Sequence, residues 1–370
     1  MNSHENEAMF ELLRMAISPS DSSQSFSKKL SVDEWARLHE SALKQLLVGI
    51  LYRAINRLPQ DCRPSIDLIF QWASEAETIK GQNIQLNEEA ARLTRLFTDC
   101  GRKSVVLKGP ANARLYPDPY MRQAGDIDLW VEGDKKSVVD LVKSMGFEVN
   151  GDVFVDHHVH FEDHGVCVEI HYKVSSGNNN PFTNNRLQRY LEKEIEKAKL
   201  VSEGFFAPTV KFNLVMQLAH IQRHFLDGGI GLKQLVDYYV LLQHSSDVER
   251  GEVAANLKKF GLWPVAGALM WILEQIFCLE KAKMLCAPDS RRGKKMLAEV
   301  LEGGNFGKAR EAKAKNFLQA WLQNKKNVLC HFGFAPSEML WHEILYWKRF
   351  VKSIPIRIRL RRVSIWNMGR

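Results

Sequence analysis

The segment 104–134, SVVLKGPANARLYPDPYMRQAGDIDLWVEGD, is the part of the chain that most constrains its fold. It predicts an apolar strand that stops at Lys108 and Gly109, a short helix, a Pro-Asp-Pro turn and a second strand that carries Asp126 and Asp128. Alternate side chains share one face of a strand, so both carboxylates project together. Adjacent carboxylates repel each other, and Mg²⁺ is a common countercharge. A bare D-x-D more often marks a solvated strand edge, so the surroundings decide.

The surroundings of this D-x-D strand favour a functional site. Gly109 follows a strand and precedes a helix, which places backbone N–H groups and the positive helix end where an anion can sit. Downstream, GVCVEIHYKV (165–174) is another alternating strand, with Cys167, Glu169 and His171 on one face. If this strand lies beside the D-x-D strand, Glu169 is a third carboxylate and His171 is a candidate to line the same cleft.

The order of these motifs resembles that of the polymerase-β-like nucleotidyltransferase superfamily. More narrowly, LKG, LYPDPYMRQAGDIDLWV and VEIHY resemble the bacterial family of uncharacterised nucleotidyltransferases. The resemblance is close over 103–174 and looser to about 243, where HIQRH and GLKQLVDYYVLL also look familial. It implies an α+β fold, in which a mixed nucleotidyltransferase-type sheet stands between helical N-terminal and C-terminal parts.

The resemblance also implies an activity, the metal-dependent transfer of a nucleoside monophosphate from an NTP to an acceptor with release of pyrophosphate. By this resemblance Asp126 and Asp128 hold two Mg²⁺ or Mn²⁺ ions, and Glu169 joins them as a catalytic residue and metal ligand that helps activate the acceptor. Lys108 and Arg122 occupy family-like positions for binding the triphosphate. The acceptor is a small molecule, a protein or an RNA, and nothing in the sequence discriminates among these partners.

Four residues are the expected nucleotide contacts, namely Lys108, Gly109, Arg122 and His171. For Arg122, a salt bridge to Asp118 or Asp126 is an open alternative. The chain departs from the superfamily after the first strand, where Gly-Ser or Gly-Gly is usual and Gly109 is followed by Pro110. Proline has no N–H, so it cannot donate a hydrogen bond to a phosphate.

This departure supports a rival hypothesis, a nucleotidyltransferase-fold protein that has lost turnover and acts as an antitoxin-like or scaffold component. The intact set of three carboxylates argues against the rival, because an inactive site has no reason to keep three mutually repelling acids.

The length of 370 residues predicts two or three domains or subdomains. Apolar spacings predict amphipathic helices over 32–58, with Ser31 as N-cap, and over about 64–100. A helix is expected over 135–144, and composition predicts a loop over 175–186. The expected parts are a helical N-terminal part (1–101), a catalytic core (102–200), a helical C-terminal part (201–347) and a basic tail (348–370).

Two groups of histidines stand outside these motifs. In the histidine-rich segment 152–165, His158 and His160 share a strand face. Polar residues on the open face of a hairpin are favoured there over a soft-metal site or substrate contacts. His220 and His224 are one helical turn apart, but no third ligand is in register, so packing near the core or closing the cleft is favoured over metal binding.

Charge is concentrated at one end of the chain. The formal net charge is +8, and residues 348–370 hold eight Lys or Arg and no acid, which accounts for the whole excess. Nucleic-acid binding through this tail is therefore an accessory role at most. Its alternation of Ile and Arg fits a strand or a membrane-surface segment, and a solvated terminus is equally open.

The N-terminal residues, the most apolar run and the cysteines indicate the cellular location that we expect for the protein. The first thirteen residues contain three Glu and no Lys or Arg, which excludes a typical signal peptide. The most apolar run, 263–277, is interrupted by Glu274 and is shorter than the roughly 20 residues of a membrane span, so no stable membrane insertion is expected. The six cysteines form no C-x-x-C, so reduced and mostly buried thiols are expected. We expect a cytoplasmic protein.

Overall fold

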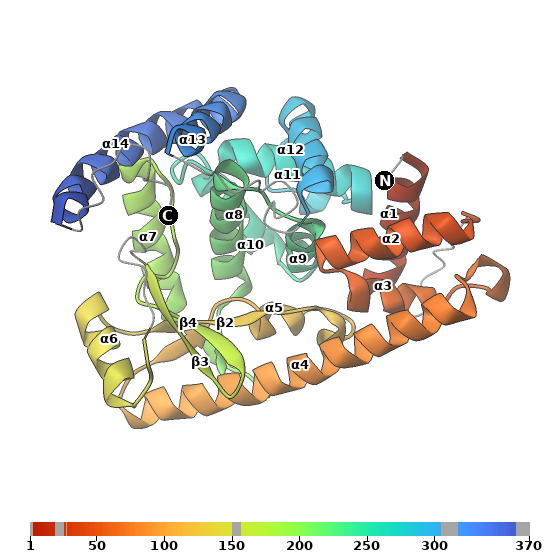
Figure 1. Ribbon diagram of the computed structural model, residues 1–370, viewed down its shortest axis with the longest axis horizontal. Coiled ribbons are helices and arrows are strands. Elements are labelled where there is room, and N and C mark those ends of the chain that lie inside the picture. Colours follow the sequence, from red (N-terminus) through yellow and green to blue (C-terminus); the bar gives the residue numbers. More distant parts are fainter. Residues whose placement is uncertain (1–2, 19–25, 27, 150–156, 305–316, 360–370) are drawn as a thin grey trace.

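A four-stranded mixed sheet, with its strands in the order β1–β2–β4–β3, carries the motifs of the segment 104–174 (Figure 1). The computed structural model describes residues 3–18, 26, 28–149, 157–304 and 317–359. Strand β2 is antiparallel to β1 and parallel to β4, and β3 is antiparallel to β4. The strands of the sheet are β1 (Ser104–Val106), β2 (Asp126–Val131), β3 (His158–Asp163) and β4 (Val166–His171). The fold is therefore α+β, as expected.

Helices make up most of the rest of the described chain. Those before or within the sheet region are α1 (Ser3–Ile17), α2 (Val32–Gln45), α3 (Val48–Ile55), α4 (Ile66–Asp99), α5 (Pro110–Ala113) and α6 (Lys135–Ser144). Those after it are α7 (Pro181–Ile195), α8 (Val210–Asp227), α9 (Leu232–Gln243), α10 (Asp247–Asn256), α11 (Trp263–Phe277), α12 (Ser290–Gly303), α13 (Phe317–Phe332) and α14 (Pro336–Arg359). Short 3₁₀ turns are η1 (Gln60–Cys62), η2 (Pro119–Met121) and η3 (Lys281–Lys283), and a small ribbon joins β5 (Lys199–Leu200) to β6 (Phe206–Ala207). None of the helices in the described residues is both long and apolar enough to cross a membrane.

Two hydrophobic clusters hold these elements together. One contains the apolar face of the sheet, including Ile127 and Val168, with Leu93 and Phe97 from α4, which runs along the sheet in Figure 1. The other joins N-terminal helices to α8, α9 and α11, and α1 packs directly on α11. This second cluster therefore contains residues from before and after the sheet. It also includes Val105 and Trp130 of the sheet, so it fixes α8 and α9 relative to the strands.

The predicted helix over 32–58 is two helices. The capping box of Ser31 and Glu34 is present, but α2 ends at Gln45, and its C-cap residue Leu46 has a left-handed φ of 56°. Helix α3 then packs against η2, where a side chain at Gly49 would collide with the Met121 carbonyl. The apolar periodicity of the sequence continues through the break and therefore does not reveal it. We attribute the break to the tertiary contact between α3 and η2.

Three further expectations need correction. The loop predicted over 175–186 ends early, because the Asn180 side chain caps α7 and Pro181 occupies its first turn. The basic tail is helical through residue 359 instead of a strand, and 360–370, like 152–156 of the histidine-rich segment, lie outside the described residues. None of the six free cysteines is buried, since four are exposed and two are half-buried.

Candidate active site

The sheet brings the three predicted carboxylates onto one face. Strands β2 and β4 pair in parallel, with Asp126 opposite Cys167 and Asp128 opposite Glu169. Side chains of directly paired residues lie on the same face of a sheet. The expected adjacency of the D-x-D strand and the Glu169 strand is therefore confirmed.

Asp128 is the most strongly compensated of these acids. The Lys108 ammonium lies 2.8 Å from Asp128 Oδ1, and His171 Nε2 lies 3.0 Å from the same oxygen. Burial alone would raise the pKa of Asp128, but the Lys108 charge and the His171 hydrogen bond outweigh it and hold that pKa well below its usual range. His171 Nε2 also lies 3.4 Å from Glu169 Oε2, so His171 contacts two of the three carboxylates, Asp128 and Glu169.

Asp126 has no such compensation. Within the described residues it forms no ion pair, and burial together with the charge of Asp128 raises the pKa of Asp126 to about 6. A carboxylate in this position is stabilised by a divalent cation, because the cation favours the ionised form. The oxygens of Asp126, Asp128 and Glu169 are the hard donors that Mg²⁺ and Mn²⁺ bind, so the residues present fit the expected metal.

Gly109 brings the backbone close to these acids. Its φ is 55°, and a Cβ there would lie 2.9 Å from the carbonyl oxygen of Asp126. The Ala111 N–H is bound to the Lys108 carbonyl at 3.1 Å, and Pro110 has no N–H. Few backbone donors at this turn are left for a phosphate, so nearby cationic side chains have to supply most of any phosphate binding.

We predict that Gly109→Ala destabilises the protein by about 1–3 kcal/mol, because it adds backbone strain and a steric contact with β2. Urea unfolding monitored by circular dichroism measures this change. The matched control is Gly146→Ala, at another left-handed glycine (φ 88°) where no atom lies within 4 Å of the new Cβ. If both variants lose the same stability, the close approach to Asp126 contributes nothing.

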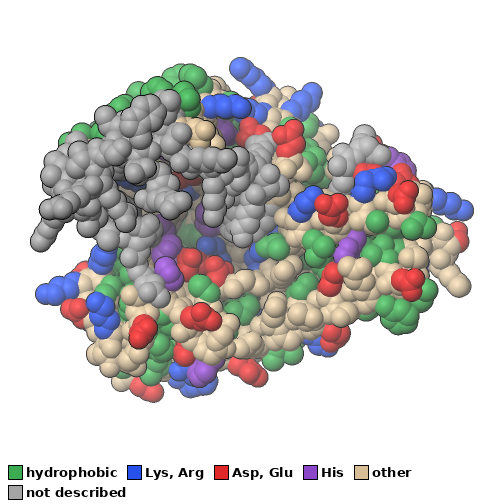
Figure 2. All heavy atoms as spheres, viewed as in Figure 1, with side chains coloured by type: hydrophobic (Ala, Val, Ile, Leu, Met, Phe, Trp, Pro, Cys, Tyr) green, Lys and Arg blue, Asp and Glu red, His purple; other side chains and the backbone are tan. Residues whose placement is uncertain are grey.

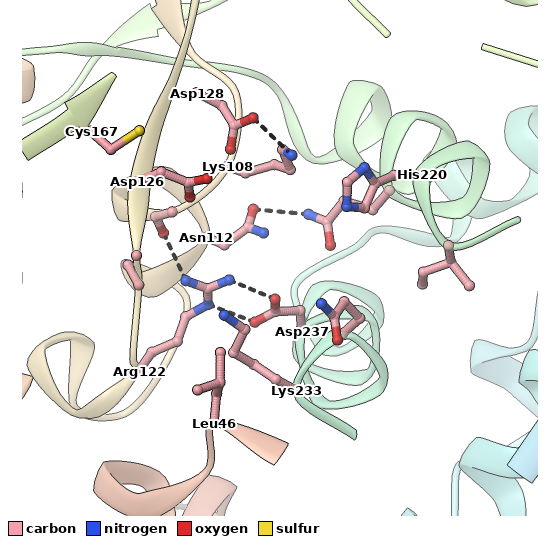
Figure 3. A pocket seen from close by; sticks show the side chains of 16 residues that line it. Leu46, Lys108, Asn112, Arg122, Asp126, Asp128, Cys167, His220, Lys233 and Asp237 are labelled. Carbon is pink, nitrogen blue, oxygen red and sulfur yellow. Dashed lines mark hydrogen bonds and ion pairs between the residues drawn. The ribbon is translucent and has the colours of Figure 1, made fainter. Parts of the chain in front are cut away.

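Arg122 forms a buried ion pair with a partner that the sequence did not suggest. Its Nε and Nη2 donate to Oδ1 and Oδ2 of Asp237 on α9, each at 2.7 Å, and Nη1 donates to the Gly109 carbonyl at 3.2 Å (Figure 3). The Tyr116 hydroxyl also donates to Asp237. The alternative that Arg122 forms a salt bridge is therefore correct, but its partner is Asp237 and not Asp118 or Asp126.

Two cavities meet at the carboxylates. The first, of about 300 Å³, is called the lysine cavity here, and the second, of about 510 Å³, the histidine cavity. In Figure 2 histidine and acidic side chains show at the bottom of a recess on the visible face. Residues that line the lysine cavity include Lys108, Gly109, Asn112, Arg122, Asp126, Asp128 and Lys233 (Figure 3). Residues that line the histidine cavity include Lys108, Asp126, His157, His158, Glu169, His171, His220 and His224.

Lys233 is a candidate functional residue that the sequence interpretation missed. It lies on α9, is 8% exposed, and its Nζ donates to the Gln123 carbonyl at 3.1 Å. It forms no ion pair within the described residues, and burial, followed by repulsion from Arg122, lowers the pKa of Lys233 to about 8. The available signal was the spacing of Lys233 and Asp237 in GLKQLVDYYVLL, since two charges one turn apart in an apolar helix need an explanation.

The histidines of α8 line the histidine cavity, which agrees with their expected place near the cleft. Burial holds the pKa of His220 well below its usual range and lowers that of His224 to about 4, so both imidazoles are neutral near pH 7. On β3, His158 faces this cavity, whereas His160 is exposed to solvent.

Comparison with known proteins places the chain in a family. The family model described as "Uncharacterised nucleotidyltransferase" matches residues 31–278, which is more than half of the chain. The protein therefore belongs to this family of uncharacterised nucleotidyltransferases. No curated protein matches the chain at a significant level. Among solved structures, an antigenic nucleotidyltransferase-like protein from Paracoccidioides brasiliensis is similar, with 14% identity and a TM-score of 0.37 over 56% of this chain and 95% of that chain.

Proposed function

We propose that the protein transfers a nucleoside monophosphate from an NTP to an acceptor, with Asp126, Asp128 and Glu169 holding Mg²⁺ or Mn²⁺. The observation that carries this proposal is the in-register pairing of Asp128 with Glu169, on the face that Asp126 shares. Bound there, divalent ions would stabilise charge on the attacking and leaving oxygens. The rival, an inactive fold, does not explain why these acids face two cavities that join at Asp126.

The lysine cavity is the proposed triphosphate site. Lys108 and Lys233 line it together with Asp126, and a buried lysine without an acidic partner is costly unless an anionic ligand compensates it. Arg122, also an expected triphosphate contact, is already neutralised by Asp237. We therefore assign Arg122 to holding the Gly109 turn against α9, and the phosphate charge to Lys108 and Lys233.

The histidine cavity is the proposed acceptor site. Glu169 and His171 line it on the sheet side, and the neutral His220 lines it from α8. An acceptor hydroxyl bound there meets Glu169 as the group that takes its proton. Small molecules, proteins and RNA ends all carry such hydroxyls, and a cytoplasmic location would supply the NTP.

Incubation of the purified protein with each α-labelled NTP, Mg²⁺ or Mn²⁺ and a cell extract tests this function. We expect label to move from one NTP to a fraction of the extract, with pyrophosphate released in step. Absence of transfer from all four NTPs, together with absence of metal binding, would overturn the proposal.

We predict that Lys233→Met weakens binding of the NTP at least tenfold and yet stabilises the fold. Folding lowers the pKa of Lys233 from 10.5 to about 8, which costs up to about 3 kcal/mol at neutral pH. The variant also loses the hydrogen bond from Lys233 to Gln123, which offsets about 1 kcal/mol of the stability gained by removing the buried charge. Net stabilisation of about 2 kcal/mol at pH 7 is expected in urea unfolding, and calorimetry measures the binding.

The sign of the pH dependence follows from the lowered pKa. Below pH 8 the folded protein must hold a charged, buried Lys233, so the stabilising effect of Lys233→Met is largest there. It should shrink as the pH rises from 8 toward 10.5, because the wild-type lysine then folds uncharged. Lys193→Met, at an exposed lysine of α7, is the control and should change neither property. Equal NTP affinity of Lys233→Met and wild type would exclude Lys233 from the triphosphate site.

A further inference from the structure

Strands β3 and β4 assemble a cluster of two histidines and one carboxylate at the edge of the histidine cavity. His158 pairs with His171 across the two strands, and Glu169 lies on the same face of β4. His171 Nε2 is 3.4 Å from Glu169 Oε2, and His158 Nδ1 is 3.5 Å from the same oxygen. A potential ligand atom from each of the three residues lies within 4.8 Å of the other two.

These separations match those around a tetrahedral metal ion. Ligand atoms about 2.1 Å from an ion and at tetrahedral angles are about 3.4 Å apart. The two measured separations from Glu169 Oε2 already have this length. The atoms that the three residues offer all lie within 4.8 Å of one another, so the remaining separation, between His158 and His171, is the one that binding would have to shorten.

The hydrogen-bond pattern points to a missing partner at His158. Its Nδ1 is buried and forms no hydrogen bond, although a carboxylate oxygen lies 3.5 Å away. Buried polar atoms without a partner are uncommon, because they lose their hydrogen bonds to water and gain none within the protein. A cation between His158, His171 and Glu169 would satisfy this nitrogen. Binding would release His171 from Asp128, which keeps the Lys108 ammonium at 2.8 Å.

We propose that His158, Glu169 and His171 bind a transition-metal ion of the Zn²⁺ class. Two imidazoles and one carboxylate suit such ions, whereas Mg²⁺ prefers oxygen donors. The three residues leave a fourth coordination position toward the histidine cavity, which they line. An ion there acts as a Lewis acid on a water or hydroxyl bound in that cavity. The site shares Glu169 with the proposed catalytic centre but does not depend on nucleotidyl transfer.

Cobalt(II) is the probe, because its visible absorption reports imidazole ligands and a low coordination number. The full-length protein is titrated with Co²⁺ in excess Mg²⁺, which occupies oxygen-donor sites, and Zn²⁺ is then added as competitor. We expect a visible band that saturates with bound Co²⁺ and is removed by Zn²⁺. His158→Ala should weaken Co²⁺ binding at least tenfold, and Glu169→Gln should do the same.

Two variants make the test specific. His160→Ala removes an exposed histidine of the same strand and should bind Co²⁺ as the wild type does. Asp126→Asn should keep the cobalt band while losing Mn²⁺ binding, which separates this site from the carboxylate pair. The proposal is overturned if His158→Ala binds Co²⁺ as tightly as the wild type, or if only Asp126→Asn and Asp128→Asn lose it. Circular dichroism confirms that each variant is folded, and His158→Gln replaces His158→Ala if that variant is not.

Discussion

Asp126→Asn and Asp128→Asn are each expected to abolish Mn²⁺ binding and to lower nucleotidyl transfer by about a thousandfold or more. A divalent ion contributes several kcal/mol to stabilising the charge of the transition state, and each 1.36 kcal/mol corresponds to about tenfold in rate. Both acids lie on the face that meets the two cavities, next to Glu169. Either change removes a negative charge that the ions require.

The two variants should differ in stability, although both lose metal. Asp126 forms no ion pair within the described residues, so Asp126→Asn relieves repulsion from Asp128 and leaves the fold at least as stable. Asp128 is buried and paired with Lys108, so Asp128→Asn removes the ion-pair partner of that ammonium and lowers the free energy of unfolding. Asp126→Asn is therefore the cleaner test of function.

Isothermal calorimetry with Mn²⁺ and the labelled-NTP assay measure these effects. Glu162→Gln, which changes an exposed acid on β3 in the same way, is the matched control and should retain both properties. Unchanged Mn²⁺ affinity in both aspartate variants would refute the metal-dependent mechanism. Loss of transfer with Mn²⁺ binding retained would assign the acids another role.

The sequence predicted the parts of the site that local patterns encode. The alternation in DIDLWV put Asp126 and Asp128 on one face, and that in VCVEIH put Glu169 on the face of Cys167 and His171, which the pairing of the two strands agrees with, because strand geometry fixes the face of each side chain. The family match over 31–278 agrees with the resemblance drawn from these motifs. Adjacency of the two strands remained conditional, since the alternation within a strand does not identify its neighbour.

Contacts between distant segments were beyond such patterns. Arg122 and Asp237 are 115 positions apart, and nothing local to Arg122 indicates a partner on α9. The place of Lys233 in the lysine cavity could not be predicted either, because it depends on how α9 packs against the sheet region. The break at Leu46 likewise follows from the packing of α3 on η2 and not from the apolar period. These are tertiary effects, and they decide which cations face the carboxylates.

Arg122→Met is expected to lower the free energy of unfolding by about 3–5 kcal/mol, because it leaves Asp237 buried without its main countercharge. Both side chains are about 5% exposed, and two hydrogen bonds of 2.7 Å join them. The pKa of Asp237 shows the dependence, since burial would raise it and the Arg122 charge instead holds it low. Lys44→Met, which breaks the exposed pair with Glu40, is the control and should leave the stability nearly unchanged.

A double variant separates the ion pair from simple loss of packing. Arg122→Met combined with Asp237→Leu removes both charges, so it should be clearly more stable than either single variant. Urea unfolding of all four proteins gives the coupling energy between the two residues. The double variant should fold, because neither charge is left buried alone. It still lacks the hydrogen bond from Arg122 to the Gly109 carbonyl, so it should bind NTP more weakly than the wild type. If the double variant is as unstable as the sum of the two single variants, the pair does not act as a unit, and the anchoring of α9 to the Gly109 turn must come from the surrounding apolar contacts instead.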